Sequence, residues 1–222
     1  SFGSTSEFSV AVTASLADPA VVVVNSTGDS SDNNPGNGTC DTGGTNSQGA
    51  TECTLRAAIQ EANAPGVVDE VRFNMPVTES GYVAGPNYWR ISPGSQLPLV
   101  STTMTIRGET QPTFVSTPVI EIDGNGAGAF ADGFRITGDN STVRSLAINR
   151  FPADGIEVAS GASGNSIVGN HLGVDPTGLV DRGNVGRGID LGSGSGPTTV
   201  GGALVADRNV ISGNGDDGIV VW

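Results

Sequence analysis

Short apolar clusters separated by polar turns run along most of the chain, which is the pattern of many short β-strands. Near the N-terminus, residues 7–15 alternate between two faces, with Phe8, Val10 and Val12 on one of them, which predicts a half-buried strand. Val21–Val24 is predicted to form a second, more buried strand. Later strands are expected at residues 71–73, 88–91, 103–106, 119–122, 134–136, 143–148 and 156–158, with more toward the C-terminus.

One segment has the period of a helix rather than of a strand. Residues 54–64 carry a single apolar face, made of Leu55, Ala58, Ile59 and Ala62. Thr54 is a suitable N-cap, and Pro65 with Gly66 ends the helix. We therefore expect one short helix in a chain that is otherwise all-β.

The second half of the sequence repeats. Residues 178–191 align without a gap on residues 208–221 at a shift of thirty, and a shift of thirty-three pairs Ile156 with Ile189. Within each unit, apolar anchors lie eleven residues apart, at Ile156, Ile167, Ile189, Val200 and Ile211. Short strands that recur with a period of 20–50 residues are typical of solenoids. The sequence therefore predicts a parallel β-helix, in which strands stack about 4.7–4.9 Å apart.

Glycine and asparagine supply the turns that such a fold needs. Glycine makes up 34 of the 222 residues, about twice its usual share of roughly 7%. Both residue types accept the left-handed conformation of tight corners. Four asparagines occupy matching repeat positions and are expected to be turn or ladder residues: Asn165, Asn170, Asn209 and Asn214.

Charge and apolar run length narrow the classes of partner. Lysine is absent, and ten arginines against 23 acidic residues give a net charge of −13. Nucleic acid is therefore not expected as a partner, because the phosphate backbone attracts positive charge. No apolar run approaches the ~18 residues that a membrane span requires, so no membrane span is expected either.

The two cysteines, Cys40 and Cys53, are separated by twelve residues rich in Gly, Thr and Asn. Free thiols or half of a metal site are the alternatives to a disulfide, but His171 is the only histidine and zinc would need carboxylate ligands. A disulfide closing this loop would stabilise the fold by about 3 kcal/mol. We expect the bond to form, which implies an oxidising compartment.

Residues that could carry out catalysis are few. Asp216 and Asp217 supply a carboxylate pair of the type that glycoside hydrolysis needs, but neighbours on a strand point to opposite faces. Arg135, Arg144 and Arg150 would suit a polysaccharide lyase, although ion pairs with nearby aspartates explain the same residues. We therefore expect no catalytic residues, with a carbohydrate-active protein as the alternative.

Calcium is the one cofactor that the sequence suggests. The polar loop after Gly28 contains Asp29, Asp32 and Asp41, which are hard oxygen donors. Their spacing matches neither an EF-hand nor the nonapeptide calcium repeats, and aspartate is common in ordinary loops. We expect no cofactor, with structural calcium in this loop as the alternative.

Residues 53–64, Cys-Thr-Leu-Arg-Ala-Ala-Ile-Gln-Glu-Ala-Asn-Ala, resemble the CSLREA-type domain found near the N-terminus of bacterial extracellular β-helix proteins. Residues 21–29 and 38–41 are similar to that family's first strand and first cysteine. Ala57 departs from the pattern, which has glutamate there. The resemblance covers about residues 20–222. It implies a right-handed parallel β-helix capped by helix 54–64 and a surface or secreted location, and it implies no reaction.

These inferences combine into one hypothesis. Residues 1–17 form an N-terminal extension, and residues 18–222 form one β-helix domain, with the disulfide loop and cap helix at 18–66 and the coils at 67–222. We predict an extracellular structural or adhesive module whose partners are itself, other surface proteins or glycans. The chain ends on an uncapped apolar strand, expected either to be cut from a longer chain or to be covered. If the chain associates, Phe8, Val10 and Val12 are expected to pair with Ile219, Val221 and Trp222. The alternative is that residues 7–15 fold back on their own β-helix, beside Val21–Val24, and that the chain is a monomer.

Overall fold

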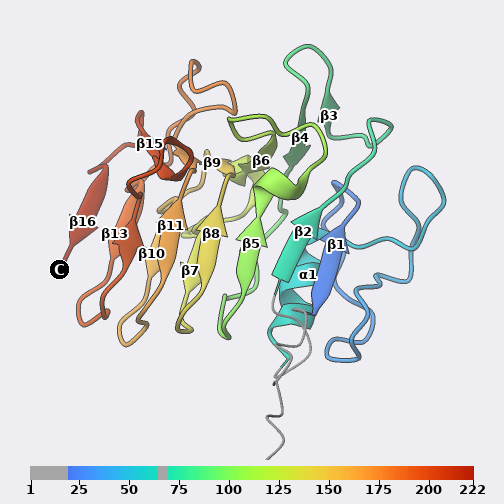
Figure 1. The fold of residues 1–222 in the computed structure, drawn as a ribbon, viewed down its shortest axis with the longest axis horizontal. Helices are drawn as coiled ribbons and strands as arrows, with labels where there is room; N and C mark the ends of the chain where they lie inside the picture. The colour runs from blue at the N-terminus through green and yellow to red at the C-terminus, as the bar shows by residue number, and fades with distance from the viewer. Residues whose placement is uncertain (1–19, 65–69) are drawn as a thin grey trace, which may run out of the picture.

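The computed structural model describes residues 20–64 and 70–222. Over these residues the chain consists mainly of short strands in parallel sheets, together with one α-helix, as the ribbon shows (Figure 1). The predicted β-rich fold class is therefore confirmed at this level. No helix in the described part of the chain is long and apolar enough to cross a membrane.

The strands form three sheets, each named here by its outermost strands. The β1–β14 sheet contains, in order, β1 (Val21–Val24), β2 (Glu70–Phe73), β5 (Thr105–Arg107), β8 (Thr142–Arg144), β11 (Ser166–Val168) and β14 (Thr199–Val200). The β7–β16 sheet contains β7 (Phe134–Ile136), β10 (Ile156–Val158), β13 (Ile189–Leu191) and β16 (Ile219–Val221). The β3–β15 sheet contains β3 (Tyr82–Val83), β4 (Tyr88–Ile91), β6 (Ile120–Asp123), β9 (Ala147–Asn149), β12 (His171–Leu172) and β15 (Val210–Ile211).

From β5 onward the chain visits the three sheets in a fixed order. It passes through β5, β6 and β7, then β8, β9 and β10, then β11, β12 and β13, and finally β14, β15 and β16. We call each such set of three strands a round. Three short 3-10 helices lie between strands, at Gly108–Thr110, Gly124–Gly126 and Val205–Asp207. Successive rounds pair in parallel, strand upon strand.

The register of these pairs places the predicted apolar anchors in three columns. One column contains Ile106, Val143, Ile167 and Val200. A second contains Ile122, Ile148, Leu172 and Ile211, and a third contains Phe134, Ile156, Ile189 and Ile219. The fully buried members of all three columns belong to a single apolar core, Val200 and Ile211 pack against it, and Ile219 is exposed. The repeats predicted at shifts of thirty-three and thirty are confirmed by the Ile156–Ile189 and Ile189–Ile219 pairs.

One predicted strand is wrong in a way that explains how the chain turns. Residues 143–148 were expected to form one strand, but they contribute to β8 and β9, which lie in different sheets. Ser145, between them, has a φ of 59°, in the left-handed region. A single left-handed residue redirects the chain at that corner, and the sequence Val-Arg-Ser-Leu-Ala-Ile contains no glycine, asparagine or proline that would indicate such a corner.

The helix α1 (Leu55–Ala62) begins and ends within the predicted range. Thr54 is its N-cap, and the side-chain oxygen of Thr54 accepts a hydrogen bond from the backbone N–H of Ala57 at 3.1 Å. Its buried face packs against β1 and β2. Arg56, on the same helix, makes a salt bridge of 3.0 Å to Asp29, which ties the polar loop before α1 to the helix.

The polar loop before α1 is fixed by a disulfide and by a buried carboxylate. Cys40 and Cys53 are bonded, as predicted. Glu61 is fully buried and accepts hydrogen bonds from the backbone N–H groups of Gly36, at 2.6 Å, and Gly38. The middle of a glycine-rich loop is therefore fastened to α1 and to the residue that precedes its N-cap.

Replacing both cysteines by serine is expected to lower the free energy of unfolding by about 3 kcal/mol, because the unfolded chain gains the freedom of a ~14-residue loop. Urea unfolding of the variant and of the parent measures the loss. Alkylation of the native parent without reductant, followed by intact-mass analysis, is expected to modify no cysteine. Two alkylated cysteines would contradict the bond.

Candidate functional site

The last round supplies the outermost strand of all three sheets at one end of the molecule. β14, β15 and β16 each pair with one neighbour and, among the described residues, have no strand on their other side (Figure 1). The chain therefore presents three open strand edges within residues 199–221. Unpaired edges are sites at which another strand can add.

The apolar core is uncovered at this end. Ile167, Leu172 and Ile189 in the preceding round are 0% exposed, whereas Ile219 in the last round is 45% exposed. Val200 and Ile211, which continue the other two columns, are only partly buried. The three columns of apolar side chains thus reach solvent in the last round.

A recess of about 390 Å³ lies over the uncovered columns. Val200, Ile211 and Ile219 line it, so each column contributes its last member. The remaining lining residues are Gly201, Gly202, Arg208 and Asn209. The recess therefore combines an apolar floor with polar groups of the last round.

Asparagine side chains link each round to the one before it. The side chain of Asn170 accepts from the backbone N–H of Leu146 at 3.0 Å and donates to the carbonyl of Val143 at 2.9 Å. Asn209 repeats this one round later, accepting from the N–H of Asn170 at 2.8 Å and donating to the carbonyl of Ile167 at 2.8 Å. The predicted ladder role is confirmed for both residues.

A second column of asparagines behaves in the same way. Asn184 accepts from the N–H of Phe151 at 3.0 Å and donates to the carbonyl of Ile148 at 3.3 Å. Asn214 in turn accepts from the N–H of Asn184 at 3.3 Å and donates to the carbonyl of Leu172 at 3.1 Å. Among the residues that the structure describes, both columns stop in the last round, at Asn209 and Asn214.

The predicted assembly residues at this end occupy different positions. Ile219 lines the recess, and Val221 is 73% exposed at the end of β16. Trp222 instead turns back toward β13, where its indole N–H donates to the Asp190 carboxylate at 2.8 Å. The Arg187 guanidinium lies 5.4 Å from the centre of its ring. Phe8, Val10 and Val12 lie outside the described residues.

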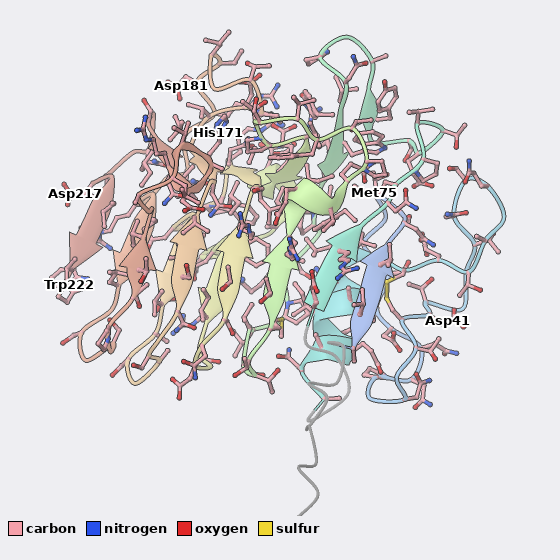
Figure 2. The ribbon with its side chains drawn as sticks, in the orientation of Figure 1. Asp41, Met75, His171, Asp181, Asp217 and Trp222 are labelled. Atoms are coloured by element: carbon pink, nitrogen blue, oxygen red, sulfur yellow. A yellow bond between two sulfur atoms is a disulfide. The ribbon has the colours of Figure 1, made fainter. Side chains whose placement is uncertain are left out.

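The residues considered for catalysis do not come together. Arg135 is paired with Glu157, Arg144 with Glu109 and Arg150 with Asp123. Asp216 lies 3.5 Å from Arg187, and Asp216 and Asp217 are both exposed. His171, labelled in Figure 2, lies on β12, where its Nδ1 is 3.3 Å from the backbone carbonyl of Asp175. Its ring is buried, and that burial lowers its pKa.

The aspartates of the polar loop do not form a cluster of calcium ligands. Asp29 is paired with Arg56, and the Asp32 carboxylate accepts from the backbone N–H groups of Asn34 and Asp41 at 2.8 and 3.0 Å. Asp41 accepts from the N–H of Gly43 at 2.7 Å. Across residues 20–64 and 70–222, no group of three or more His, Cys, Asp or Glu side chains could hold a metal ion.

A buried ionic cluster, not predicted from the sequence, lies on the outer side of the β3–β15 sheet. Glu121 on β6 is 0% exposed and accepts from Arg90 at 2.7 Å, from Asn149 at 2.9 Å and from Arg182. Burial alone would raise the pKa of Glu121, but these hydrogen bonds outweigh it and lower the pKa. Arg182 belongs to the loop between β12 and β13, so the cluster attaches that loop to the sheet.

A different row of charges follows the outer side of the β7–β16 sheet. Arg135, Glu157 and Asp190 lie side by side in register on β7, β10 and β13. Partial burial, together with the nearby Asp132 and Asp190 carboxylates, raises the pKa of Glu157 to about 7, although Arg135 opposes the shift. Glu157 is therefore partly protonated near neutral pH.

This shift makes stability depend on pH. The pKa of Glu157 is higher in the folded chain than its ordinary value of 4.5, so the folded state binds more protons between those values. The contribution of Glu157 to stability is expected to grow as pH falls from about 7 to 4.5. The difference in unfolding free energy between the parent and Glu157→Gln, measured from pH 8 to 4, isolates it. Asp217→Asn, on an exposed turn, is the control and should leave the pH profile unchanged.

The parent is compared with Glu157→Gln at each pH because His171 changes the stability of the fold with pH in the opposite direction. Its pKa is lowered on folding by burial, so its contribution to stability falls as pH drops below about 6.5. A difference between parent and Glu157→Gln that stays flat across this range would contradict the raised pKa of Glu157.

Neither a family model, nor a curated protein, nor a solved structure matches this chain. The functional argument therefore depends on the geometry described above. The last round, β14, β15 and β16, is the candidate site for contact with further polypeptide, of this chain or of another, because its described apolar and backbone groups have fewer partners than the same groups in earlier rounds.

Proposed function

We propose that this chain is an extracellular structural module, built as a right-handed parallel β-helix, which joins another polypeptide through its last round. The observation that carries the proposal is the uncovered core at that end, where Ile219 is 45% exposed and its register partner Ile189 is 0% exposed. Burying a side chain of this size is worth about 1.5–3 kcal/mol. The free energy available from three such columns favours association.

The ordered visits to three parallel sheets support the β-helix architecture. Connections between parallel strands of one sheet are right-handed in the great majority of proteins, which supports the hand. The Cys40–Cys53 disulfide supports an oxidising location, as does the resemblance to the CSLREA-type domain of bacterial extracellular β-helix proteins. The position of α1 against β1 and β2 agrees with the capping role that this resemblance implies.

A structural role is preferred over a catalytic one because the charged side chains are engaged with one another. Arg90 and Arg182 bind Glu121, and Arg150 binds Asp123. A carbohydrate-active protein is the alternative function. Release of reducing ends or unsaturated products from pectin, alginate or xylan, abolished in Arg150→Ala or Asp216→Asn, would favour that alternative.

Association is tested by light scattering over a range of concentrations. The parent is expected to associate, and Ile219→Asp with Val221→Asp is expected to raise the dissociation constant at least tenfold, because charges would enter the apolar contact. Val115→Asp with Leu179→Asp is the matched control, since both side chains are 88% exposed and lie outside the last round. Circular dichroism verifies that both double variants are folded.

Two results would contradict the proposed contact. A parent that stays monomeric at every concentration would do so, as would an associated species of unchanged size in Ile219→Asp with Val221→Asp. Removing residues 1–17 tests whether Phe8, Val10 and Val12 contribute. Loss of association after this deletion would identify residues 7–15 as the strand that adds to the open end.

A further inference from the structure

A second recess, here called the hairpin recess, lies beside β3 and β4, at the opposite edge of the β3–β15 sheet from β15 (Figure 1). Its volume is about 460 Å³, within the ~300–1,000 Å³ range of small-molecule sites. The β3–β4 hairpin forms one wall, through Tyr82, Pro86 and Asn87. The segment before β6 forms the other, because every second residue from Thr113 to Val119 lines the recess. Two segments that are distant in sequence therefore enclose it.

The ring of Tyr82 is fixed from two directions. Tyr82 and Trp89 are register partners across the hairpin, and their ring centres lie 5.0 Å apart. Trp89 is itself buried, and its indole N–H donates to the carbonyl of Pro76 at 2.9 Å. The Tyr82 hydroxyl donates to the side-chain oxygen of Asn87 at 2.8 Å. The hairpin recess therefore contains a half-buried aromatic ring that a ligand need not order on binding.

Polar groups that line the hairpin recess together with this ring have no partners of their own. The side-chain oxygen of Asn87 is engaged with Tyr82, but its amide N–H groups donate to no described residue. The side-chain hydroxyls of Thr113 and Thr117 likewise have no hydrogen-bond partner in the part of the chain that the structure describes. Asn87, Thr113 and Thr117 are all exposed. A ligand would therefore meet amide donors and hydroxyl groups as well as an aromatic ring.

The hairpin recess differs from most of the surface in having no charge, since none of the described residues that line it is charged. The chain as a whole has a net charge of −13, which disfavours an acidic ligand, and no described arginine in the recess offsets that repulsion. A cation would find no carboxylate among the same lining residues. The ligand that fits is therefore uncharged and has both apolar faces and hydroxyl groups.

We propose that the hairpin recess binds a neutral, β-linked glucan without cleaving it. A glucose ring in this linkage has equatorial substituents, so its axial C–H groups form apolar faces that can lie against Tyr82. Its hydroxyl groups point outward from the ring, where the amide and hydroxyl groups of the recess can pair with them. Cleavage is not expected, since glycoside hydrolysis needs two carboxyl groups and no described lining residue carries one. This site goes beyond the contact proposed for the last round and does not depend on it.

Isothermal titration calorimetry of the full chain with cellohexaose tests the proposal. Cellohexaose is expected to bind with an affinity that stays constant between about 50 and 500 mM NaCl, because no charged group takes part. Maltohexaose, its α-linked isomer, is expected to bind about tenfold more weakly, because the α linkage turns successive rings out of a common plane. Hexagalacturonate is acidic and is expected not to bind.

Two variants locate the site, and a third is the matched control. Tyr82→Ala removes the ring and is expected to weaken cellohexaose binding about tenfold. Asn87→Asp keeps the acceptor for the Tyr82 hydroxyl but loses the amide donors, so it is expected to weaken binding about three- to tenfold. Phe130→Ala is expected to change nothing, because Phe130 is an aromatic residue that is 88% exposed but does not line the hairpin recess. Circular dichroism verifies that each variant is folded.

Several results would overturn the glucan site: no binding of cellohexaose, equal affinities for cellohexaose and maltohexaose, or an equal loss of affinity in Phe130→Ala. If Tyr82→Ala does not fold, Asn87→Asp decides, and unchanged affinity in that variant would overturn the proposal. A polypeptide strand that adds to β3 is the alternative occupant, and its backbone pairing would not need the Asn87 amide.

The test is separate from that of association through the last round. Ile219→Asp with Val221→Asp is expected to bind cellohexaose as tightly as the parent does, because neither residue lines the hairpin recess. A chain that associates but binds no glucan would overturn this inference alone. A chain that binds cellohexaose but stays monomeric at every concentration would overturn the proposed contact alone.

Discussion

Replacing Glu121 by alanine is expected to lower the free energy of unfolding by about 3–5 kcal/mol, among the largest effects of any single change in this chain. Glu121 is 0% exposed, and its removal would leave the Arg90 and Arg182 guanidinium groups without their shared carboxylate. Asn149, also fully buried, would lose its contact with Glu121 as well. The two guanidinium groups would then lose their shared buried counter-charge, and Arg90 would keep only Tyr88 at 2.8 Å and the more distant Asp123 at 3.6 Å.

Urea unfolding measures the effect, and Asp216→Ala provides the matched control. Asp216 also pairs with an arginine, Arg187, but its side chain is 56% exposed, so its loss is expected to cost less than about 1 kcal/mol. A cost below about 1 kcal/mol for Glu121→Ala as well would contradict the interpretation that the cluster is shielded from water. Proteolysis of the loop containing Arg182 should quicken in Glu121→Ala alone.

Replacing Asn170 by alanine is expected to cost about 3 kcal/mol. The variant leaves the N–H of Leu146 and the C=O of Val143 without partners, and each unsatisfied buried group costs about 1–3 kcal/mol. Asn170 itself is 0% exposed, so water cannot replace the amide without a rearrangement. Chemical unfolding of the purified variant gives the loss directly.

Asn209→Ala is the matched control for this variant, since it removes the same chemistry one round later. Asn209 is only half-buried and lies at the open end, where water can reach the groups that it would leave. A cost of about 1 kcal/mol is therefore expected. Equal costs for the two variants would show that the position of an asparagine along the ladder does not matter.

The sequence predicts the repeated part of this fold because each prediction there depends on local pattern. Apolar anchors such as Ile156 and Ile189 lie one repeat apart. Strands of successive repeats therefore pair side by side, with these anchors in register. The asparagine ladder follows from the same periodicity. The disulfide and α1 were also predicted, since a lone pair of cysteines and a capped amphipathic segment leave few alternatives.

The predictions that failed, or were never made, concern contacts between distant residues. Glu121 and Arg182 are separated in sequence by about two rounds. The residues next to either one do not indicate that the two side chains form an ion pair. The corner at Ser145 depends on one backbone angle. Ion pairs with nearby aspartates were expected for three arginines, and Arg150 does bind Asp123. Arg135 and Arg144 bind Glu157 and Glu109 instead, which come from neighbouring rounds.

The last ladder position has a chemical consequence for the lifetime of the molecule. Of the four ladder asparagines Asn170, Asn184, Asn209 and Asn214, only Asn214 is followed by glycine, the neighbour whose unhindered nitrogen most readily attacks the side-chain amide and expels ammonia. In the folded chain the N–H of Gly215 donates to the carbonyl of Asn184 at 2.8 Å, which holds that nitrogen away from the reaction. Fraying of the last round would release it, and the aspartate formed could no longer donate to Leu172. Among the ladder asparagines, deamidation would therefore begin in the last round, and a bound partner would slow it.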